Sequence, residues 1–232
     1  MTVQLCEQVQ TDWFRTRAEL LGEVRTDGPL TWLRGPDEIS LMFPETLPVA
    51  SLARGSRWAS SLGLSIGAWL DRETDPGPLA DAGFEQGWEP WWMVAGLDSV
   101  AEPDDPRVVL QESTTDYGGD YARYADLLAL ARLRPKRSWY AAARTTDGQF
   151  AGHAWAHRVG AVAGIFDMAV WPPFQRTGLG SALLRSVCVA ARDVGATRAV
   201  LNATPEGKLL YSRHGFRQVG TGITWWYHPR ST

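Results

Sequence analysis

Residues 170–184, VWPPFQRTGLGSALL, have the types and spacing that suit binding of an anion. Gly178 and Gly180 allow the backbone to come close to a ligand, and an apolar helical run follows them. The first turn of a helix offers free N–H groups and the positive end of the helix dipole. Side chains that can add donors to the same anion come just before: Gln175, Arg176 and Thr177. The stretch therefore predicts a phosphate or pyrophosphate site.

Two common phosphate loops do not fit this stretch. A Walker A loop requires Gly-Lys-Ser/Thr, which is absent from these residues. A dinucleotide-binding turn requires a third glycine, but Leu183 stands in that place. It also requires an acidic residue at the end of the next strand, and none lies near Asn202. A nucleotide-dependent oxidoreductase is therefore disfavoured.

The stretch resembles the V-x-P-x-x-Q/R-x-x-G-x-G/A signature of the GCN5-related N-acetyltransferases, the GNAT family. The resemblance covers about residues 108–228 and includes the strand before the turn, the helix after it and the later YSRHGF. It implies that the turn holds the pyrophosphate of acetyl-CoA, which serves as cosubstrate. It also implies an enzyme that acetylates a primary amine of a small molecule or peptide by direct attack in a ternary complex.

The resemblance further assigns roles to single residues. Backbone groups of 168–170 would bind the pantetheine arm, and amides from Gln175 or Arg176 to Ser181 would hold the pyrophosphate. Tyr211 matches the tyrosine that protonates the departing CoA thiolate, whereas Glu206 and His214 are expected to be solvated. The cofactor-binding residues implied in this way are Met168, Ala169, Val170, Gln175, Arg176, Thr177, Gly178, Leu179, Gly180, Ser181 and Asn202.

The strand before the turn lacks the general base that many GNAT members have there. The corresponding inward positions are Gly164 and Phe166, and neither side chain can accept a proton. Asp167 is expected on the opposite face by strand alternation. We expect His153 and His157 to be exposed on the preceding strand; the alternative is that they relay a proton through water. The base is unassigned: it comes from the N-terminal part or is water.

The spacing of apolar residues predicts the strands and helices that position the turn. The nearly continuous apolar run 161–171 predicts a central strand, and the run 177–196 predicts an amphipathic helix that ends at Gly195. Strands interspersed with helices indicate an α/β or α+β fold with a mixed central sheet flanked by helices, the GNAT fold. Further strands are expected within 28–46, 63–70, 89–97, 108–114, 138–145, 150–159, 197–204 and 223–228, and further helices within 11–24, 71–84, 121–133 and 205–215.

A weak internal repeat suggests two GNAT-like halves. Gly83-Phe84 is followed by Trp91-Trp92, and Gly215-Phe216 is followed by Trp225-Trp226. The Pro- and Asp-rich segment 98–107 is the best linker candidate between them. Some members of the family that the sequence resembles carry a first, degenerate copy of the fold without the acetyl-CoA turn. The resemblance therefore implies such a copy at residues 1–103 and a catalytic domain at 104–232.

Composition narrows the partners. A formal net charge of −3 gives no electrostatic case for nucleic acid, and no apolar run approaches the roughly 20 residues that span a bilayer. The N-terminus lacks signal-peptide features, and the two cysteines lie in no metal-ligand spacing. We expect a cytoplasmic monomer or homodimer that uses no metal. The alternative to an enzyme is a non-catalytic acetyl-CoA-binding regulatory module, because the strand base is missing.

Overall fold

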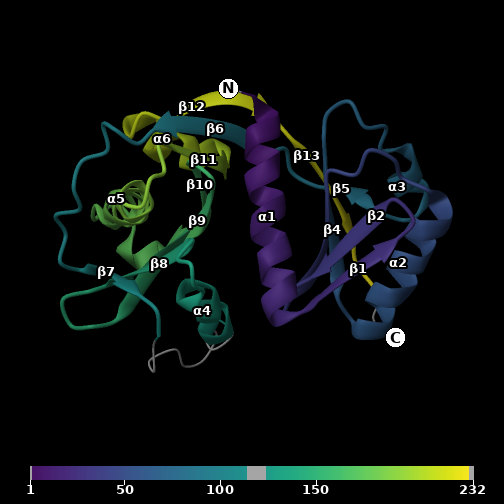
Figure 1. Cartoon of the computed structure of the whole chain (residues 1–232), viewed down its shortest axis with the longest axis horizontal. Helices are drawn as coiled ribbons and strands as arrows, with labels where there is room; N and C mark the ends of the chain where they lie inside the picture. Colours follow the sequence, from purple (N-terminus) through teal and green to yellow (C-terminus); the bar gives the residue numbers. More distant parts are fainter. Residues whose placement is uncertain (1, 114–123, 230–232) are drawn as a thin grey trace. The chain divides into compact units, whose positions relative to one another are not determined.

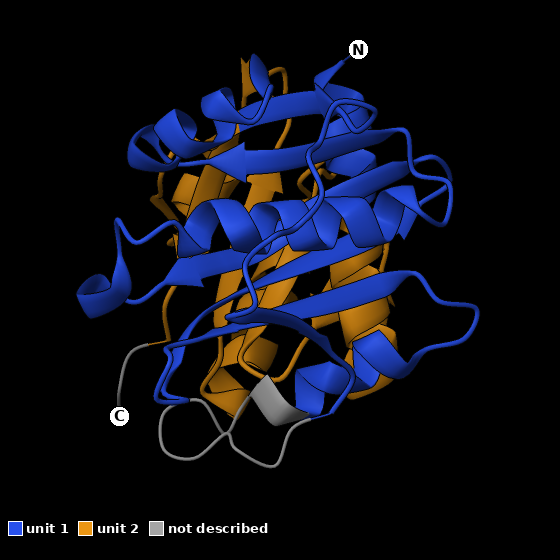
Figure 2. Ribbon diagram, turned by 90° about the vertical axis from the view of Figure 1, so that its left-hand side faces the viewer, with its two compact units in different colours: residues 1–9, 92–219 blue, residues 10–91, 220–232 orange. Residues whose placement is uncertain are grey.

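The computed structural model describes residues 2–113 and 124–229, and the chain forms two compact units (Figure 2). Unit 1 comprises residues 1–9 and 92–219, and unit 2 comprises residues 10–91 and 220–232. Each unit is therefore built from two separate segments of the chain. A boundary between two sequence halves at residue 103 stays a prediction.

Unit 2 contains a six-stranded mixed sheet with the order β1-β2-β3-β4-β13-β5, and Figure 1 labels β1, β2, β4, β13 and β5. β3 and β4 are parallel, and the other described pairs are antiparallel. The strands are β1 (Glu23–Asp27), β2 (Leu30–Arg34), β3 (Glu38–Met42), β4 (Ser65–Leu70), β5 (Glu85–Gln86) and β13 (Ile223–Tyr227). The helices are α2 (Val49–Leu62), α3 (Gly77–Asp81) and most of α1 (Val3–Leu21). The sequence pattern does not predict α2 and β1, and α1 begins earlier than the expected helix 11–24.

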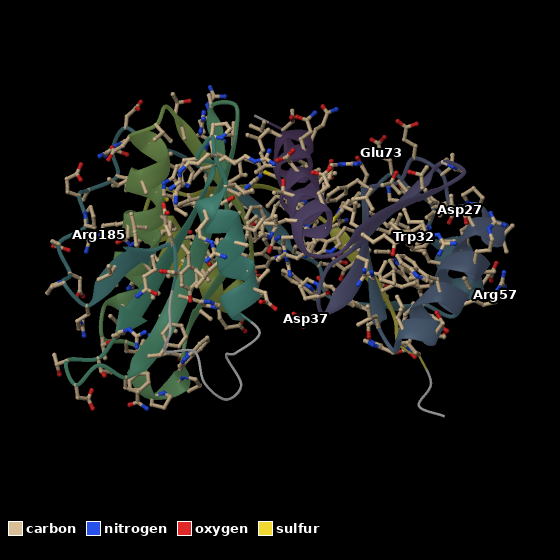
Figure 3. All side chains as sticks on the ribbon, turned by 60° about the horizontal axis from the view of Figure 1, so that its bottom comes forward. Asp27, Trp32, Asp37, Arg57, Glu73 and Arg185 are labelled. Carbon is tan, nitrogen blue, oxygen red and sulfur yellow. The ribbon has the colours of Figure 1, made fainter. Side chains whose placement is uncertain are left out.

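The core of unit 2 forms where α2 lies over the sheet. Trp32 of β2 is 1% exposed and sits among the core side chains, where Figure 3 labels it. Gly55 of α2 faces this ring, because a Cβ atom at Gly55 would lie 2.4 Å from Cζ2 of Trp32. The helix therefore needs glycine at this position to approach the indole, even though glycine weakens a helix interior.

Unit 1 contains a seven-stranded sheet with the order β12-β6-β11-β10-β9-β8-β7. β10 and β11 are parallel, whereas β7, β8, β9 and β10 pair in antiparallel fashion. The strands are β6 (Trp91–Gly96), β7 (Val108–Gln111), β8 (Ser138–Arg144), β9 (Phe150–Val159), β10 (Val162–Val170), β11 (Arg198–Ala203) and β12 (Arg217–Thr221). The helices are α4 (Tyr124–Arg132), α5 (Leu179–Arg192) and α6 (Pro205–Arg213). Of the expected helix 121–133, residues 121–123 lie outside the described part of the chain.

Helix α5 packs across β8, β9 and β10, and the first part of its predicted apolar stripe is buried. Leu179, Leu183 and Val187 are at most 2% exposed, whereas Val194, just beyond the helix, is 43% exposed. The chain turns after the helix through Gly195, whose φ of +99° favours glycine. This packing places the N-terminus of α5 beside the end of β10.

The two Trp-Trp strands each lie in the sheet formed mainly by the other part of the sequence. β6 lies between β12 and β11, and β13 lies between β4 and β5. β13 pairs with β4 from Ile223↔Leu70 to Tyr227↔Ile66. β6, which ends the first copy of the repeated pattern, therefore belongs to the sheet of unit 1. β13, which ends the second copy, belongs to the sheet of unit 2.

Candidate functional site

The turn between β10 and α5 is held by its own side chains. Gln175 Nε2 donates to the carbonyl oxygen of Val170 at 2.9 Å, which ties the turn to the strand end. Thr177 Oγ1 donates to the carbonyl oxygen of Phe174 at 2.7 Å. Arg176 and Gly178 have φ values of 63° and 89°, in the left-handed region. A backbone that alternates in this way turns successive N–H groups toward one side, which favours an anion.

Helix α5 begins directly after this turn at Leu179, with Gly178 as its N-cap. No acidic residue lies in its first turn. The first N–H groups of the helix have no intrahelical partner and lie at the positive end of its dipole. The helix start therefore offers the N–H groups of its first turn as donors, directly after the left-handed residues Arg176 and Gly178.

Gly180 shows how closely three elements meet at the site. A Cβ atom at this position would lie 3.2 Å from Leu210 Cδ2, and 3.9 Å from both Met168 Cε and Val170 Cγ2. The start of α5 therefore adjoins the end of β10 and a side chain of α6. These contacts bring together three of the predicted cofactor-binding residues: Met168, Val170 and Gly180.

The end of β10 separates from β11. The parallel pairing runs from Val162↔Arg198 to Gly164↔Val200, and no pair follows it although both strands are described in full. Against β9, the register shifts between Phe166 and Ala169. This β-bulge places Asp167 at a φ of 46°, with its side chain exposed. On the β11 side, the backbone of residues 168–170 is not used by the described sheet, and Asn202 lies half-buried on β11.

Gly164 and Phe166 share one face of the sheet with the two histidines of β9. Gly164 pairs with His157, and Phe166 pairs with Trp155. The Phe166 ring covers Gly164, because a Cβ atom there would lie 2.4 Å from Phe166 Cε2. Val9 of α1 lies on the same face. These two strand positions therefore supply no proton acceptor.

The expectation that His153 and His157 are exposed is wrong. They are 2% and 0% exposed, because β9 is a central strand that is buried on both faces. His157 Nδ1 lies 2.8 Å from Ser138 Oγ, and His153 Nδ1 lies 3.4 Å from Tyr140 Oη. His153 also contacts Trp171, with ring centroids 5.4 Å apart.

Tyr211 lies on α6, which begins after Thr204, whose side chain accepts a hydrogen bond from the N–H of Gly207. Its ring packs against Phe216 at 5.9 Å between centroids. Burial, with a smaller contribution from Cys188, raises the pKa of Tyr211 to about 12. The phenol therefore stays protonated at neutral pH. Burial likewise raises the pKa of Cys188 to about 12, so this thiol is not a nucleophile.

His214 is not merely solvated, contrary to expectation. Its Nε2 lies 2.9 Å from Oγ of Ser181, in the first turn of α5. Partial burial and then the positive charge of Arg185 lower its pKa below the ordinary value of 6.5. The end of α6 is therefore linked by a side chain to the turn.

The segment 98–107, which was expected to be a linker, lies within unit 1 and contacts α5 through side chains of that helix. Arg185, labelled in Figure 3, donates to Asp104 at 2.6 Å. Arg192 forms an ion pair with Glu102 and donates to the carbonyl oxygen of Val100 at 3.0 Å. Arg107, at the end of the segment, reaches the turn itself, because its Nη2 donates to the carbonyl oxygen of Thr177 at 3.0 Å.

Comparison with known proteins gives this geometry a family context. Residues 104–216 match the model of the acetyltransferase (GNAT) family. A GCN5-related N-acetyltransferase from Kribbella flavida has a TM-score of 0.64 at 15% identity, over 100% of this chain and 97% of that one. A protein from Novosphingobium aromaticivorans, whose structure is described as that of a putative acetyltransferase from the GNAT family, has a TM-score of 0.61 at 19% identity, over 98% of this chain and 99% of that one.

A third structure has two such domains. A tandem GNAT protein from the clavulanic acid biosynthesis pathway has a TM-score of 0.57 at 15% identity, over 88% of this chain and 79% of that one. These likenesses confirm the predicted fold class.

No curated protein matches the chain. Within residues 2–113 and 124–229, no helix is long and apolar enough to cross a membrane, and no group of three or more His, Cys, Asp or Glu side chains could hold a metal ion.

Proposed function

Because residues 104–216 carry a domain of the GNAT acetyltransferase family, we propose that the protein is an acetyl-CoA-dependent N-acetyltransferase. Its acceptor would be a primary amine of a small molecule or peptide. The observation that carries the proposal is the turn from Gln175 to Ser181, in which left-handed residues and a helix start line up amide donors. The pyrophosphate of acetyl-CoA is negatively charged, and the turn favours a negatively charged ligand.

The cosubstrate would extend from the turn along β10. We propose that the pantetheine arm bonds to backbone groups of Met168, Ala169 and Val170, where β10 no longer pairs with β11. An extended amide-bearing arm can take the place of the missing strand neighbour. Asn202, on the facing strand, would complete the binding residues.

The chemistry is direct transfer. The amine nitrogen attacks the thioester carbonyl, the new C–N bond forms, and the C–S bond breaks to release the CoA thiolate. A backbone N–H near Ala169 or Val170 would stabilise the oxyanion. Tyr211 would face the departing sulfur. With its pKa raised to about 12, Tyr211 is a weaker acid than a thiol of pKa about 8.5, so its role is hydrogen-bond donation rather than complete proton transfer.

The proton from the amine would pass to water. Gly164 and Phe166 cannot accept it, and both histidines on their sheet face are buried. An unprotonated amine needs no strong base for attack, so water suffices when the amine is neutral. This route makes the rate depend on the pKa of the acceptor amine.

We also propose that the N-terminal part is a degenerate copy of the fold. β2-β3-α2-β4-α3-β5 and β9-β10-α5-β11-α6-β12 have the same order of elements, and each series has one parallel pair flanking a helix. β5 and β12 are edge strands next to β13 and β6. The loop before α2 contains no Q-x-x-G-x-G sequence, so this copy would not bind acetyl-CoA.

Calorimetric titration with acetyl-CoA tests the proposal. The wild-type protein should bind, and Gly180→Glu should abolish binding because the new side chain meets Leu210 and brings a negative charge to the amide donors. Gly96→Glu is the matched control, since a Cβ atom there meets nothing within 4 Å. An absence of heat with wild-type protein at high micromolar ligand contradicts acetyl-CoA binding. Binding without thiol release across a panel of amines contradicts catalysis.

A further inference from the structure

Arg107 connects the segment before β7 to the anion turn. Its Nη2 donates to the carbonyl oxygen of Thr177 at 3.0 Å and to Asp105 Oδ2 at 2.7 Å. Its Nε donates to Asp105 Oδ1 at 2.9 Å. The guanidinium therefore binds one carboxylate with two donors and uses one of them to hold the turn as well. This residue lies 71 positions before Gly178, outside the signature sequence.

The guanidinium is itself held in place. The Asp105 side chain is 16% exposed, and the hydrogen bond from Arg107 is the main cause that lowers its pKa, so the carboxylate is ionised at neutral pH. Asp105 Oδ1 also accepts from the N–H of Arg107 at 3.0 Å. The carbonyl oxygen of Arg107 accepts from the N–H of Arg144 in β8 at 2.8 Å. The sheet and the carboxylate thus hold Arg107 from two directions.

The contact with Thr177 has a consequence for Gly178. In a planar trans peptide, the carbonyl oxygen of one residue and the N–H of the next point in opposite directions. A carbonyl of Thr177 that is held toward Arg107 therefore directs the N–H of Gly178 away from Arg107. Glycine, with φ of 89° here, would otherwise allow this peptide to rotate and offer its carbonyl oxygen to an anion.

We propose that Arg107 is a positioning residue for cosubstrate binding, which fixes the 177–178 peptide so that the N–H of Gly178 is presented to the pyrophosphate. The inference rests on the proposed function, because it takes acetyl-CoA as the ligand. Arg107 is not proposed to contact the phosphates, since its charge is paired with Asp105. Its role is to keep a carbonyl dipole out of the anion site.

The experiment compares two ligands in wild-type protein and Arg107→Met. CoA carries the pyrophosphate, whereas S-acetyl-pantetheine ends before it. Loss of the Thr177 contact should weaken CoA binding about tenfold, in line with loss of one hydrogen bond to a charged group. The kcat/KM value with S-acetyl-pantetheine should stay unchanged, and a merely structural role would lower both.

Arg54→Met is the matched control. Arg54 binds Asp27, labelled in Figure 3, through Nε and Nη2 at 2.8 and 2.7 Å, but it belongs to unit 2. This variant should bind CoA like the wild type. Arg107→Lys keeps the charge but not the forked geometry, so it should give a smaller loss and serves if the Met variant does not fold.

Each outcome decides the inference separately from the proposed function. If wild-type protein binds CoA and neither Arg107 variant is weakened, the positioning role is wrong. The same holds if Arg107→Met loses CoA and S-acetyl-pantetheine equally. If wild-type protein does not bind CoA, the proposed function fails first, and the inference fails with it.

Discussion

Nε2 of His214, at the end of α6, lies 2.9 Å from Oγ of Ser181, in the first turn of α5. This hydrogen bond joins the last helix of unit 1 to the amide donors of the turn. Partial burial and then Arg185 lower the pKa of His214 below 6.5, so the neutral ring is favoured in the folded protein. The link between α6 and the turn is therefore sensitive to pH.

The stability of the protein should depend on His214 in mildly acidic solution. The unfolded chain takes up a proton on this ring near pH 6.5, before the folded chain does, so the free energy of unfolding decreases as the pH falls through about 6.5. Thermal unfolding of wild-type protein and His214→Gln at pH 7.5, 6.5 and 5.5 measures this contribution. The stability difference between the two should shrink or change sign toward pH 5.5, and parallel curves would contradict the lowered pKa.

Tyr211→Phe should lower kcat by about tenfold to a hundredfold while leaving the Kd for acetyl-CoA unchanged, because the phenol would stabilise only the leaving thiolate. Release of CoA, followed with a thiol reagent, measures kcat. Tyr227→Phe is the matched control: its hydroxyl lies 2.9 Å from Ser60 Oγ in unit 2, and its loss should not change kcat. An unchanged kcat in Tyr211→Phe removes the proposed role.

The pH dependence between 7 and 10 is a separate check on Tyr211. Since its pKa is about 12, ionisation of the phenol should produce no decline in kcat within this range. A decline in wild-type protein that is absent from Tyr211→Phe would show that the phenol ionises earlier than its burial predicts.

His153→Gln should leave the acidic limb of the kcat/KM profile at the same pH. The ring is 2% exposed and contacts Tyr140 and Trp171, so it is placed for packing rather than for proton uptake from an amine. Two amines of different pKa should shift the limb, because the amine itself must lose its proton before attack. A limb that follows His153 instead would identify this imidazole as the base.

Gly55→Ala should destabilise the protein by about 1–3 kcal/mol, a typical cost of overpacking a core. The added Cβ would lie 2.4 Å from Cζ2 of Trp32, whose side chain is buried in the core of unit 2. This cost exceeds the gain of about 1 kcal/mol in helix propensity. Urea unfolding measures the change, with Gly96→Ala, in open space, as the control. A stabilised variant would mean that α2 shifts away from the sheet at little cost.

Local pattern was sufficient to predict much of the region around the turn. The apolar pattern of β10 and that of α5 are set by residues close together in the sequence, as are the glycines of the turn. Periodicity and backbone preference therefore reveal these features. The pattern does not predict helix α2, although Pro48 precedes the helix and Gly63 ends it with a φ of 65°. Its interior glycine and serines suggest a loop, and only contact with Trp32 explains why Gly55 is there.

The histidines show where alternation was insufficient. A strand with small or apolar residues between polar ones suggests one exposed face, but β9 lies in the middle of the seven-stranded sheet and is buried on both. Burial depends on what covers each face, and that cover comes from segments distant in the sequence. The exposure of His153 and His157 was therefore not readable from their own strand.

The chemical character of the turn can be predicted from residues 170–184 alone, because its glycines and the start of its helix lie within this stretch. The contacts of Arg107 with Thr177 and of His214 with Ser181 depend on long-range packing. Long-range pairing likewise places β13 between β4 and β5, and β6 between β12 and β11. Because the two Trp-Trp strands have similar sequences, each could pair with the neighbours of the other. Which strands they pair with depends on long-range contacts, which a local sequence pattern does not show.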